Sequence, residues 1–440
     1  MSDKVAMAPG PALASGRGVS EAVAASIKRR YAAERRFRAY GLAAIVFAIL
    51  CLAILLFTII RTALPAFTQT MIRLEVTLDA QAIDPTGARD PQTLSSADYQ
   101  KLVRNALDEL FPGVTDRPQR RELMGLLSPG AVYFVRDQVM NDPSLIGTRI
   151  SIRVPFSDDV DQFAKRRVDA AGLGGEHRLS DKQIEWFHEL DQRGMVERAF
   201  NTTLFTTGDS RSPELAGVWG ALVGTFWTML ITLVIAFPLG VGAATYLEEF
   251  APKNRWTALI EVNINNLAAV PSIVFGLLGL AVFINFFGLP RSTPLVGGMV
   301  LSLMTMPIII IASRAALKAV PPSIREAALG VGASKVQTVF HHVVPQAMPG
   351  MLTGAILGMA HAIGETAPLL MIGMVAFIVD IPSGPLDAAT VMPVQIFLWS
   401  DAPERAFVER SSAAILILLG FLVAMNLLAV LLRKRFEQKW

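Results

Sequence analysis

The chain alternates between long apolar runs and one extended polar stretch. The first apolar run, 40–60, carries no charged residue and lies between Arg38 and Arg61. A signal-peptide core is only about 7–15 residues long, so this longer run predicts a retained membrane helix. Five further runs predict five more membrane helices, over about 218–244, 267–288, 295–313, 351–379 and 412–432. The run 351–379 is longer than a bilayer requires, which predicts a tilt, a kink or a partly re-entrant piece.

The polar stretch between the first two runs has the patterns of a folded domain. More than half of the Asp, Glu, Lys and Arg residues of the chain fall between 65 and 217. Apolar and polar residues alternate over 71–79 and 149–154, which is the period of a half-buried strand. Helical patterns cover 97–111, 118–127 and 180–200. We therefore expect a small α+β insert over 62–216. It serves either as a contact for an extracytoplasmic partner or as a solvated cap.

Composition excludes several classes of protein. Of the 440 residues, 52% are hydrophobic and 18% charged, whereas soluble domains carry roughly 25% charged residues. The net charge of +3 is too small to indicate nucleic-acid binding. The single cysteine, Cys51, excludes an internal disulfide and a cysteine-based metal cluster. His177 and His188 lack the spacing of metal ligands. We expect no catalytic residue and no metal site.

Basic residues near the ends of the runs indicate the orientation in the membrane. Lys and Arg crowd the tail 1–39 and follow the last run. Six spans place both ends on one side, and the positive-inside rule makes that side cytoplasmic. The fold class that we expect is an all-α polytopic membrane protein with six transmembrane helices. An extracytoplasmic α+β insert separates the first helix, 40–61, from a core over 217–440.

The cytoplasmic segment 321–345 predicts two short helices around a turn. Each helix begins with the spacing of a capping box, in which Ser precedes Glu or Gln by three residues. The two pairs are Ser323 with Glu326 and Ser334 with Gln337. Gly330 and Gly332 lie between the helices, where a left-handed turn needs glycine. We expect Pro345 to end the second helix.

This segment resembles the EAA loop of bacterial ABC importer permeases. Glu326, Ala327 and Ala328 are followed, after three residues, by Gly332. In that family the loop docks into a groove on a cytoplasmic ATPase, so the resemblance implies that these four residues contact the ATPase. The family pattern then continues to Ile-x-Leu-Pro, of which this chain keeps only the proline. A plainer interpretation makes Glu326 only a helix-capping carboxylate.

The nucleotide-binding machinery is absent from this sequence. No GxxxxGK[ST] loop occurs, and such a loop is what cradles the phosphates of ATP in nucleotide-binding proteins. We therefore expect a transport subunit that is not an enzyme and carries no cofactor, with ATP hydrolysis performed by a separate subunit.

A carboxylate, Glu365, falls inside the fifth apolar run. An ionised carboxylate in a membrane costs about 3 kcal/mol or more unless it is paired or hydrated. His361 lies one helical turn earlier on the same face and is in reach of it. We interpret this pair as part of a pathway or gate, the alternative being a buried polar lock between subunits. Arg314 and Arg325 flank the coupling region, where they either receive substrate, contact the ATPase or serve only as positive-inside anchors.

The sequence around Glu365 narrows the family. Ile-Gly-Glu-Thr-Ala-Pro-Leu-Leu over 363–370, and the run 240–249, resemble the PstA-type permease of bacterial phosphate importers. The resemblance covers 217–440, and the long insert matches the longer PstA variants. It implies import of inorganic phosphate across the bacterial inner membrane. The implied partners, besides membrane lipid, are a PstC-type permease, a dimer of ATP-binding subunits and an extracytoplasmic phosphate-binding protein. Glu365 is then expected to pair with a basic residue and to release it during gating.

Three alternatives remain open at this point. The same machinery serves other oxyanions, such as molybdate, sulfate or phosphonate. A stand-alone transporter driven by protons through Glu365 and His361 would not need an ATPase, so dependence on an ATPase discriminates it. A membrane sensor that uses the insert would need a cytoplasmic signalling domain, which the sequence does not contain.

Overall fold

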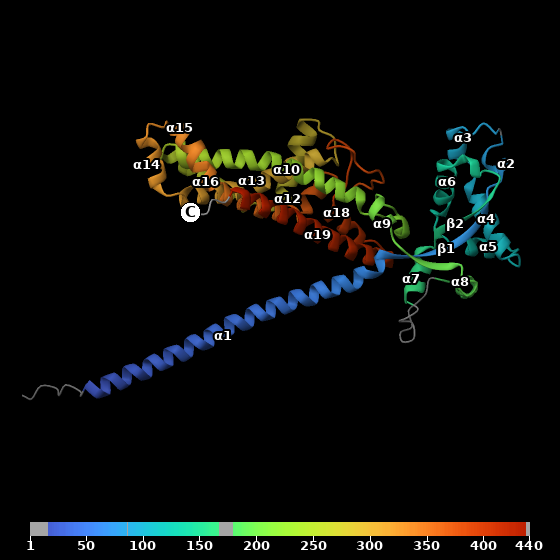
Figure 1. The fold of residues 1–440 in the computed structure, drawn as a ribbon, viewed down its shortest axis with the longest axis horizontal. Helices are drawn as coiled ribbons and strands as arrows, with labels where there is room; N and C mark the ends of the chain where they lie inside the picture. The colour runs from blue at the N-terminus through green and yellow to red at the C-terminus, as the bar shows by residue number, and fades with distance from the viewer. Residues whose placement is uncertain (1–15, 86, 167–178, 437–440) are drawn as a thin grey trace, which may run out of the picture. The chain divides into compact units, whose positions relative to one another are not determined.

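The computed structural model describes residues 16–85, 87–166 and 179–436 (Figure 1). It divides the chain into two units, 1–61 and 62–440. The first unit consists, where described, of helix α1 (Gly16–Ala63) up to Arg61. Apolar side chains along it, such as Phe47 and Phe57, are exposed, as in a helix that is surrounded by lipid. The helix contains the first predicted span and begins well before it. His177, which the sequence suggested is no metal ligand, lies outside the described residues.

Among the described residues, five helical segments are long and apolar enough to cross a membrane. They cover Arg29–Phe67, Trp219–Phe250, Pro294–Ala319, Lys335–Ala362 and Arg405–Arg435. A bent pair of helices, Arg255–Leu267 and Ser272–Phe286, makes a sixth span if the pair counts as one. The protein is thus mostly helical, with five to six apolar helices, where the sequence predicted six.

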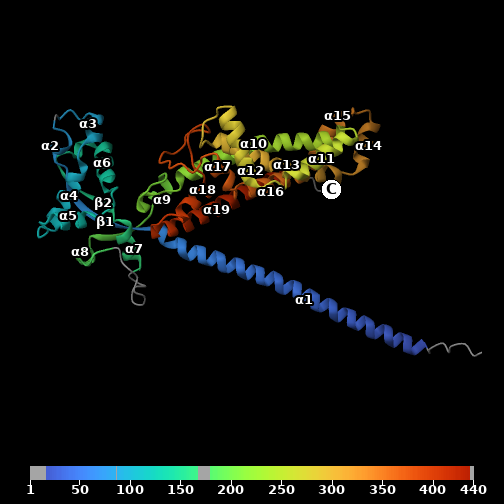
Figure 2. The same cartoon turned by 180° about the vertical axis from the view of Figure 1, so that it is seen from behind.

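Four long helices form the body of the membrane core. They are α10 (Trp219–Thr245), α13 (Pro294–Ala319), α16 (Val344–Ala362) and α19 (Arg405–Phe436). They lie side by side in both views (Figures 1 and 2), with α13 packed between α10 and α16. Small residues allow the close approach of α13 and α16, since a Cβ on Gly354 would lie 2.5 Å from Cβ of Ala312. Such small-residue contacts are typical of membrane helices, where backbones pack closely.

Two of the predicted spans are broken. The run 267–288 is divided between α11 (Arg255–Leu267), α12 (Ser272–Leu278) and a π-helical continuation, η5 (Gly279–Phe286). A bend of 105° separates α11 from α12, at a break that ends in Pro271. The run 351–379 is not one helix either, because α16 ends at Ala362 and only a short helix, α17 (Ala367–Met371), follows. The next helix is α18 (Met392–Ser400).

The insert is built on an antiparallel three-stranded sheet with the order β2-β1-β3. The strands are β1 (Thr68–Thr77), β2 (Arg149–Pro155) and β3 (Val196–Phe200). Leu74 of β1 pairs with Ile152 of β2, and Ile72 pairs with Val196 of β3. Ile72, Leu74 and Val76 are all fully buried, so the alternation in the sequence correctly predicted the buried face of the central strand.

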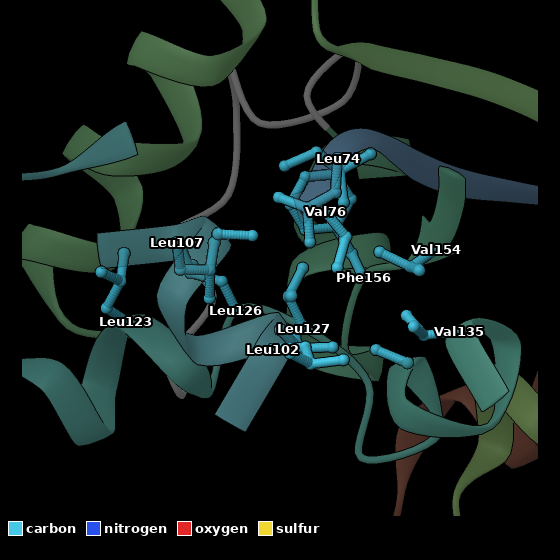
Figure 3. Close-up of a cluster of buried hydrophobic side chains, with 14 of the residues drawn as sticks. Leu74, Val76, Leu102, Leu107, Leu123, Leu126, Leu127, Val135, Val154 and Phe156 are labelled. Atoms are coloured by element: carbon cyan, nitrogen blue, oxygen red, sulfur yellow. The ribbon is translucent and has the colours of Figure 1, made fainter. Parts of the chain in front are cut away.

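Short helices cover this sheet. Those before β2 are α2 (Ala80–Ile83), α3 (Pro91–Ser96), α4 (Tyr99–Leu110), α5 (Arg117–Met124), α6 (Ala131–Asn141) and η2 (Pro143–Leu145). After β2, α7 (Asp158–Arg166) and α8 (Asp181–Gln192) belong to the same cover, whereas α9 (Thr203–Thr206) and η3 (Pro213–Leu215) pack against α10 and α19 of the core. Figure 3 shows Leu102 and Leu107 of α4 and Val135 of α6 in one cluster with Val76 and Phe156. The insert therefore has a hydrophobic core of its own.

The predicted C-terminal end of one helix of the insert is wrong. The helix expected over 180–200 stops at Gln192, and Val196–Phe200 forms the edge strand β3 instead. Gly194 adopts a left-handed φ of 70°, which ends a helix and which glycine tolerates. Pairing of β3 with β1 is a long-range contact, so no local pattern could specify it. Helices α6 and α7 are absent from the sequence prediction.

A buried charge cluster joins α7 to the first turns of α19. The Arg410 side chain is buried and donates to the carbonyl of Ala216. Asp161 accepts from the backbone N–H of Thr70 at 2.8 Å and pairs with Lys165 at 2.6 Å. Asp161, Lys165 and Arg410 line a small cavity between the two helices. Buried charges are tolerated when they are paired and hydrogen-bonded, so this cluster attaches the insert to the core.

Two further acids in that cavity are shifted toward their neutral forms. Burial, together with the nearby carboxylates Asp159, Glu214 and Asp161, raises the pKa of Asp158 to about 7, and the charge of Arg410 opposes this only in part. Burial also raises the pKa of Glu214, although the hydroxyl of Ser128 donates to it at 2.6 Å. Asp158 therefore titrates in the physiological pH range.

Candidate functional site

The predicted coupling segment forms a helix, a turn and a second helix at one end of the core. The first helix, α14 (Pro322–Gly330), and the second, α15 (Lys335–Thr338), lie at the end of the bundle opposite to α9 (Figure 1). The capping box expected at Ser323 and Glu326 is absent, because the helix begins at Pro322 without a side-chain cap. Pro321 precedes a proline and is held extended, with ψ at 138°. Glu326 therefore lies too far along the helix to reach its first N–H groups.

The turn and the start of the second helix follow the sequence prediction. Ser334 Oγ accepts from the N–H of Gln337 at 3.2 Å, and Gln337 Oε1 accepts from the N–H of Ser334 at 2.9 Å. Gly332 has a φ of +90°, whereas Gly330 is the last residue of α14 and is not among the residues of positive φ. Only Gly332 therefore needs to be glycine for its backbone conformation.

Pro345 does not end the second helix as predicted. A π-helical turn, η6 (Val339–Val343), continues α15 directly into α16. Pro345 lies in the first turn of α16, where a missing N–H is tolerated. Residues 335–362 thus form one continuous helical segment, which connects the coupling segment rigidly to a span.

The exposed face of the coupling segment combines a carboxylate with apolar side chains. Glu326 and Ala327 are exposed, while Ala328 is buried at 7% exposure. Ala328 therefore packs inward, and only two residues of the Glu-Ala-Ala run are presented to solvent. The large apolar residues exposed on the segment are Leu329, Val331, Val336 and Phe340. An exposed apolar patch of this kind is typical of a protein interaction site.

Arg314 and Arg325, which were candidates for substrate or ATPase contact, are engaged within the chain. Arg314 Nη2 donates to Glu261 at 2.7 Å, and its Nε to Glu248 at 3.4 Å. Arg325 Nη2 donates to Glu249 at 2.6 Å. Glu248 and Glu249 belong to a π-helical turn, η4 (Tyr246–Phe250), at the end of α10. The sequence analysis did not single out these acids, although the run 240–249 already stood out by its resemblance.

Glu365 lies in the break between α16 and α17. Its carboxylate is 3.3 Å from Nε2 of His361, with side-chain exposures of 19% and 53% for the Glu and the His. The N–H of Glu365 bonds to the carbonyl of Ala362, the last residue of α16. The side-chain contact with His361 is thus present. Within the described part of the chain, Glu365 forms no ion pair with Lys or Arg.

Glycine allows the two broken spans to pack against each other beside this acid. A Cβ on Gly276 of α12 would lie 2.7 Å from Cα of Pro368 in α17. Irregular backbone within a membrane is tolerated where it is covered by protein or lines a cavity, and discontinuous helices often carry transport sites. The structure therefore shows two separate features: an acid at the break of a broken apolar span, and an exposed apolar patch on the coupling segment at one end of the core.

Comparison with known proteins identifies the class of protein to which this chain belongs. A family model described as "Binding-protein-dependent transport system inner membrane component" matches residues 236–440, and one described as "Domain of unknown function (DUF3333)" matches 24–172. The first match contains the coupling segment, Glu365 and the last span. The chain is a multi-pass membrane permease subunit of an ABC transporter. Such subunits are not enzymes, and ATP hydrolysis belongs to a separate subunit.

Curated relatives narrow the family further. The phosphate transport system permease protein PstA 1 of Mycobacterium tuberculosis (strain CDC 1551 / Oshkosh) is 32% identical over 248 residues, which cover 56% of this chain and 75% of that protein. The probable ABC transporter permease protein YqgI of Bacillus subtilis (strain 168) is 36% identical over 165 residues, or 38% of this chain and 56% of that protein. The chain belongs to the PstA family of permeases, as a long variant with an additional N-terminal domain.

Solved structures are more distant. A chain of the MetNI methionine ABC transporter shares 17% identity with a TM-score of 0.39, over 50% of this chain and 95% of that chain. A likeness of this degree carries no argument about the substrate or the partners of this chain.

Proposed function

We propose that this protein is the PstA-type subunit of an ATP-driven importer that moves inorganic phosphate into the cytoplasm. The observation that carries the proposal is the coupling segment, in which an exposed Glu326 and an apolar patch lie on two helices, the second of which continues directly into a span. Members of the PstA family that are similar to this chain are named phosphate transport permeases, which supports phosphate as the substrate.

In this proposal the complete assembly contains a PstC-type partner permease, two ATP-binding subunits and an extracytoplasmic phosphate-binding protein. The chain crosses the bacterial inner membrane six times, with the bent pair α11–α12 counted as one span. Both termini are cytoplasmic and the insert is extracytoplasmic. No cofactor is bound by this chain. Four residues of the coupling segment contribute to the contact with the ATPase: Glu326, Ala327, Ala328 and Gly332. Ala328 is buried and contributes by supporting the exposed residues of the segment.

Glu365 serves as a gating residue in this proposal. Its carboxylate lies at a helix break and contacts His361, an arrangement that changes if α16 and α17 move apart. A negative side chain does not attract phosphate, so its role is to open and close a polar contact. We expect a basic residue of the partner permease to complete that contact in one state of the cycle.

The test is uptake of labelled phosphate at low external concentration, in cells that lack this gene and every other phosphate importer. The intact gene should restore uptake. Gly332→Ala should not, because an alanine at this φ costs about 1–2 kcal/mol and distorts the turn. Gly330→Ala is the matched control, because its φ is ordinary and a Cβ added to Gly330 would have no neighbour within 4 Å, as at Gly332.

The outcomes separate the parts of the proposal. Unchanged phosphate uptake after deletion of the gene would exclude phosphate as the substrate, and uptake of other labelled oxyanions would then be measured. Equal uptake by the two glycine variants would exclude the assigned role of the turn. Uptake that persists without the ATPase subunit would indicate a stand-alone transporter.

A further inference from the structure

One guanidinium group connects three elements at the cytoplasmic end of the core. Arg325, on α14, donates from Nη2 to Glu249 Oε1 at 2.6 Å and from Nε to the same oxygen at 3.2 Å. Its Nη1 donates to the carbonyl of Val320 at 2.8 Å, and its Nη2 to the carbonyl of Leu317 at 3.0 Å. Leu317 lies in the last turn of α13 and Val320 is its C-cap. The side chain therefore joins α14 to both α10 and α13.

Each of these contacts provides a partner for a polar group whose burial without a partner would cost free energy. The last carbonyls of a helix have no partner within the helix, and a cation near them is favourable. The side chain of Glu249 is only 9% exposed, so its charge depends on a partner. Arg presents several donors in a fixed fork, which Lys does not have. Arg325 thus fits this position because it satisfies a buried carboxylate and two helix-end carbonyls at once.

The neighbouring acid extends the connection to a fourth helix. Glu248 lies 3.4 Å from Arg314 of α13, and Arg314 in turn pairs with Glu261 of α11 at 2.7 Å. Glu248 and Glu249 are both in the π-helical turn η4, and such turns occur frequently at functional sites. Charged contacts therefore connect α14, α10, α13 and α11 at the end of the core that carries the coupling segment.

These contacts leave little of Arg325 for a ligand. Nε, Nη1 and Nη2 all donate within the chain, and the side chain is 25% exposed. A released phosphate would have to displace a buried carboxylate to bind there. Glu326, the next residue along α14, is exposed instead. The helix thus has an inner side that is fixed to the spans and an outer side that is open to a partner.

We infer that Arg325 and Glu249 are positioning residues, which fix the coupling helix α14 to the ends of α10 and α13 so that a displacement of α14 moves both spans. The inference rests on the proposed function, in which α14 receives that displacement from the ATPase. Neither residue contacts the substrate or the ATPase. Their effect is on how much transport each hydrolysed ATP produces.

The test uses the complete transporter, purified with its partner permease, ATPase and binding protein and placed in phospholipid vesicles. Phosphate uptake and ATP hydrolysis are measured together for Glu249→Gln and Arg325→Lys. Gln keeps the shape of Glu but loses its charge, and Lys keeps the charge of Arg but loses the fork. We expect both variants to assemble and hydrolyse ATP, with uptake per ATP at least fivefold below that of the unaltered transporter.

The matched control is Lys318→Gln. Lys318 lies in the same cluster, 3.6 Å from Glu248, but its side chain is 59% exposed, so its removal should change uptake per ATP by less than twofold. Hydrogen exchange of the α14 amides gives a second readout, which is independent of the substrate. It should be at least fivefold faster in Glu249→Gln than in Lys318→Gln, while exchange within α13 stays unchanged.

The possible results are distinct. Uptake per ATP within twofold of the unaltered value in both variants, with unchanged exchange in α14, overturns the inference. If Glu249→Gln does not assemble with the ATPase, exchange of the α14 amides decides instead: exchange at least fivefold faster than in Lys318→Gln supports the inference, and equal exchange overturns it. If the unaltered transporter does not take up phosphate, the proposed substrate is wrong, and the exchange measurement still decides the role of Arg325 and Glu249.

Discussion

The titration of Asp158 gives the sharpest prediction for the insert. Its pKa is raised from 3.8 to about 7, first by burial and then by neighbouring carboxylates. The folded chain therefore holds this proton more tightly than the unfolded chain. The resulting stabilisation is fully present below about pH 4 and is lost as the pH rises through about 7. A shift of about three units corresponds to about 4 kcal/mol, as an upper limit for a coupled cluster.

Asp158→Asn removes the ionisation and keeps the size of the side chain. At pH 5 the folded chain keeps Asp158 neutral but the unfolded chain has mostly lost that proton, so the variant should already be more stable by roughly 1–2 kcal/mol. At pH 8 the variant should be more stable, by up to about 4 kcal/mol. Opening of α7 is measured by hydrogen exchange of the full-length protein in lipid nanodiscs from pH 5 to pH 8, corrected for the intrinsic exchange rate at each pH.

A control variant separates this effect from the general response to pH. Asp137 is exposed, with its side chain at 62%, and pairs with Arg136 on the same helix. Asp137→Asn should therefore follow the pH dependence of the unaltered protein. If Asp158→Asn changed the exchange of α7 by the same factor at pH 5 and pH 8, the reasoning from burial and like charge would be refuted.

Two further predictions concern the broken spans. Glu365→Gln should lower phosphate uptake roughly tenfold or more, because it weakens a charged contact with His361; unchanged uptake and unchanged coupled ATP hydrolysis would contradict the gating role. Gly276→Ala should lower the free energy of unfolding of the purified protein by roughly 1–3 kcal/mol, and with it the melting temperature, because the new methyl group would lie 2.7 Å from Cα of Pro368. Gly242→Ala, where nothing lies within 4 Å, should leave the melting temperature unchanged or slightly raised, and equal losses in the two variants would rule out the packing argument.

Local signals in the sequence predicted several structural features well. The charge-free run 40–60 and the apolar runs corresponding to α10, α13 and α19 predicted spans, because a bilayer requires a continuous apolar stretch. Alternation over 71–79 identified the central strand. Ser334 and Gln337 predicted the start of α15, because a capping box involves only residues three apart.

Local signals failed where a neighbouring residue or a distant contact decided the outcome. Ser323 has capping-box spacing, but the proline pair at 321–322 starts the helix earlier. The end of the predicted helix 180–200 is a strand, because pairing with β1 decides its conformation. By contrast, the excess length of the run 351–379 predicted a tilt, a kink or a partly re-entrant piece, and the chain does break between Ala362 and Ala367.

The residues of the candidate site also fall into those that local sequence patterns identified and those that only the fold brought together. Glu326, Gly332 and Glu365 could be chosen from the sequence, because a motif and an intramembrane charge are local features. The contact of Arg325 with Glu249 joins residues 76 positions apart, and the cluster around Arg410 joins α7 to the last span. By itself the sequence indicated which segments are apolar enough to cross a membrane and which family they resemble. Only the tertiary structure decided which charges meet, because a buried charge is stabilised by the partner that folding brings to it, and the order of residues along the chain does not specify that partner.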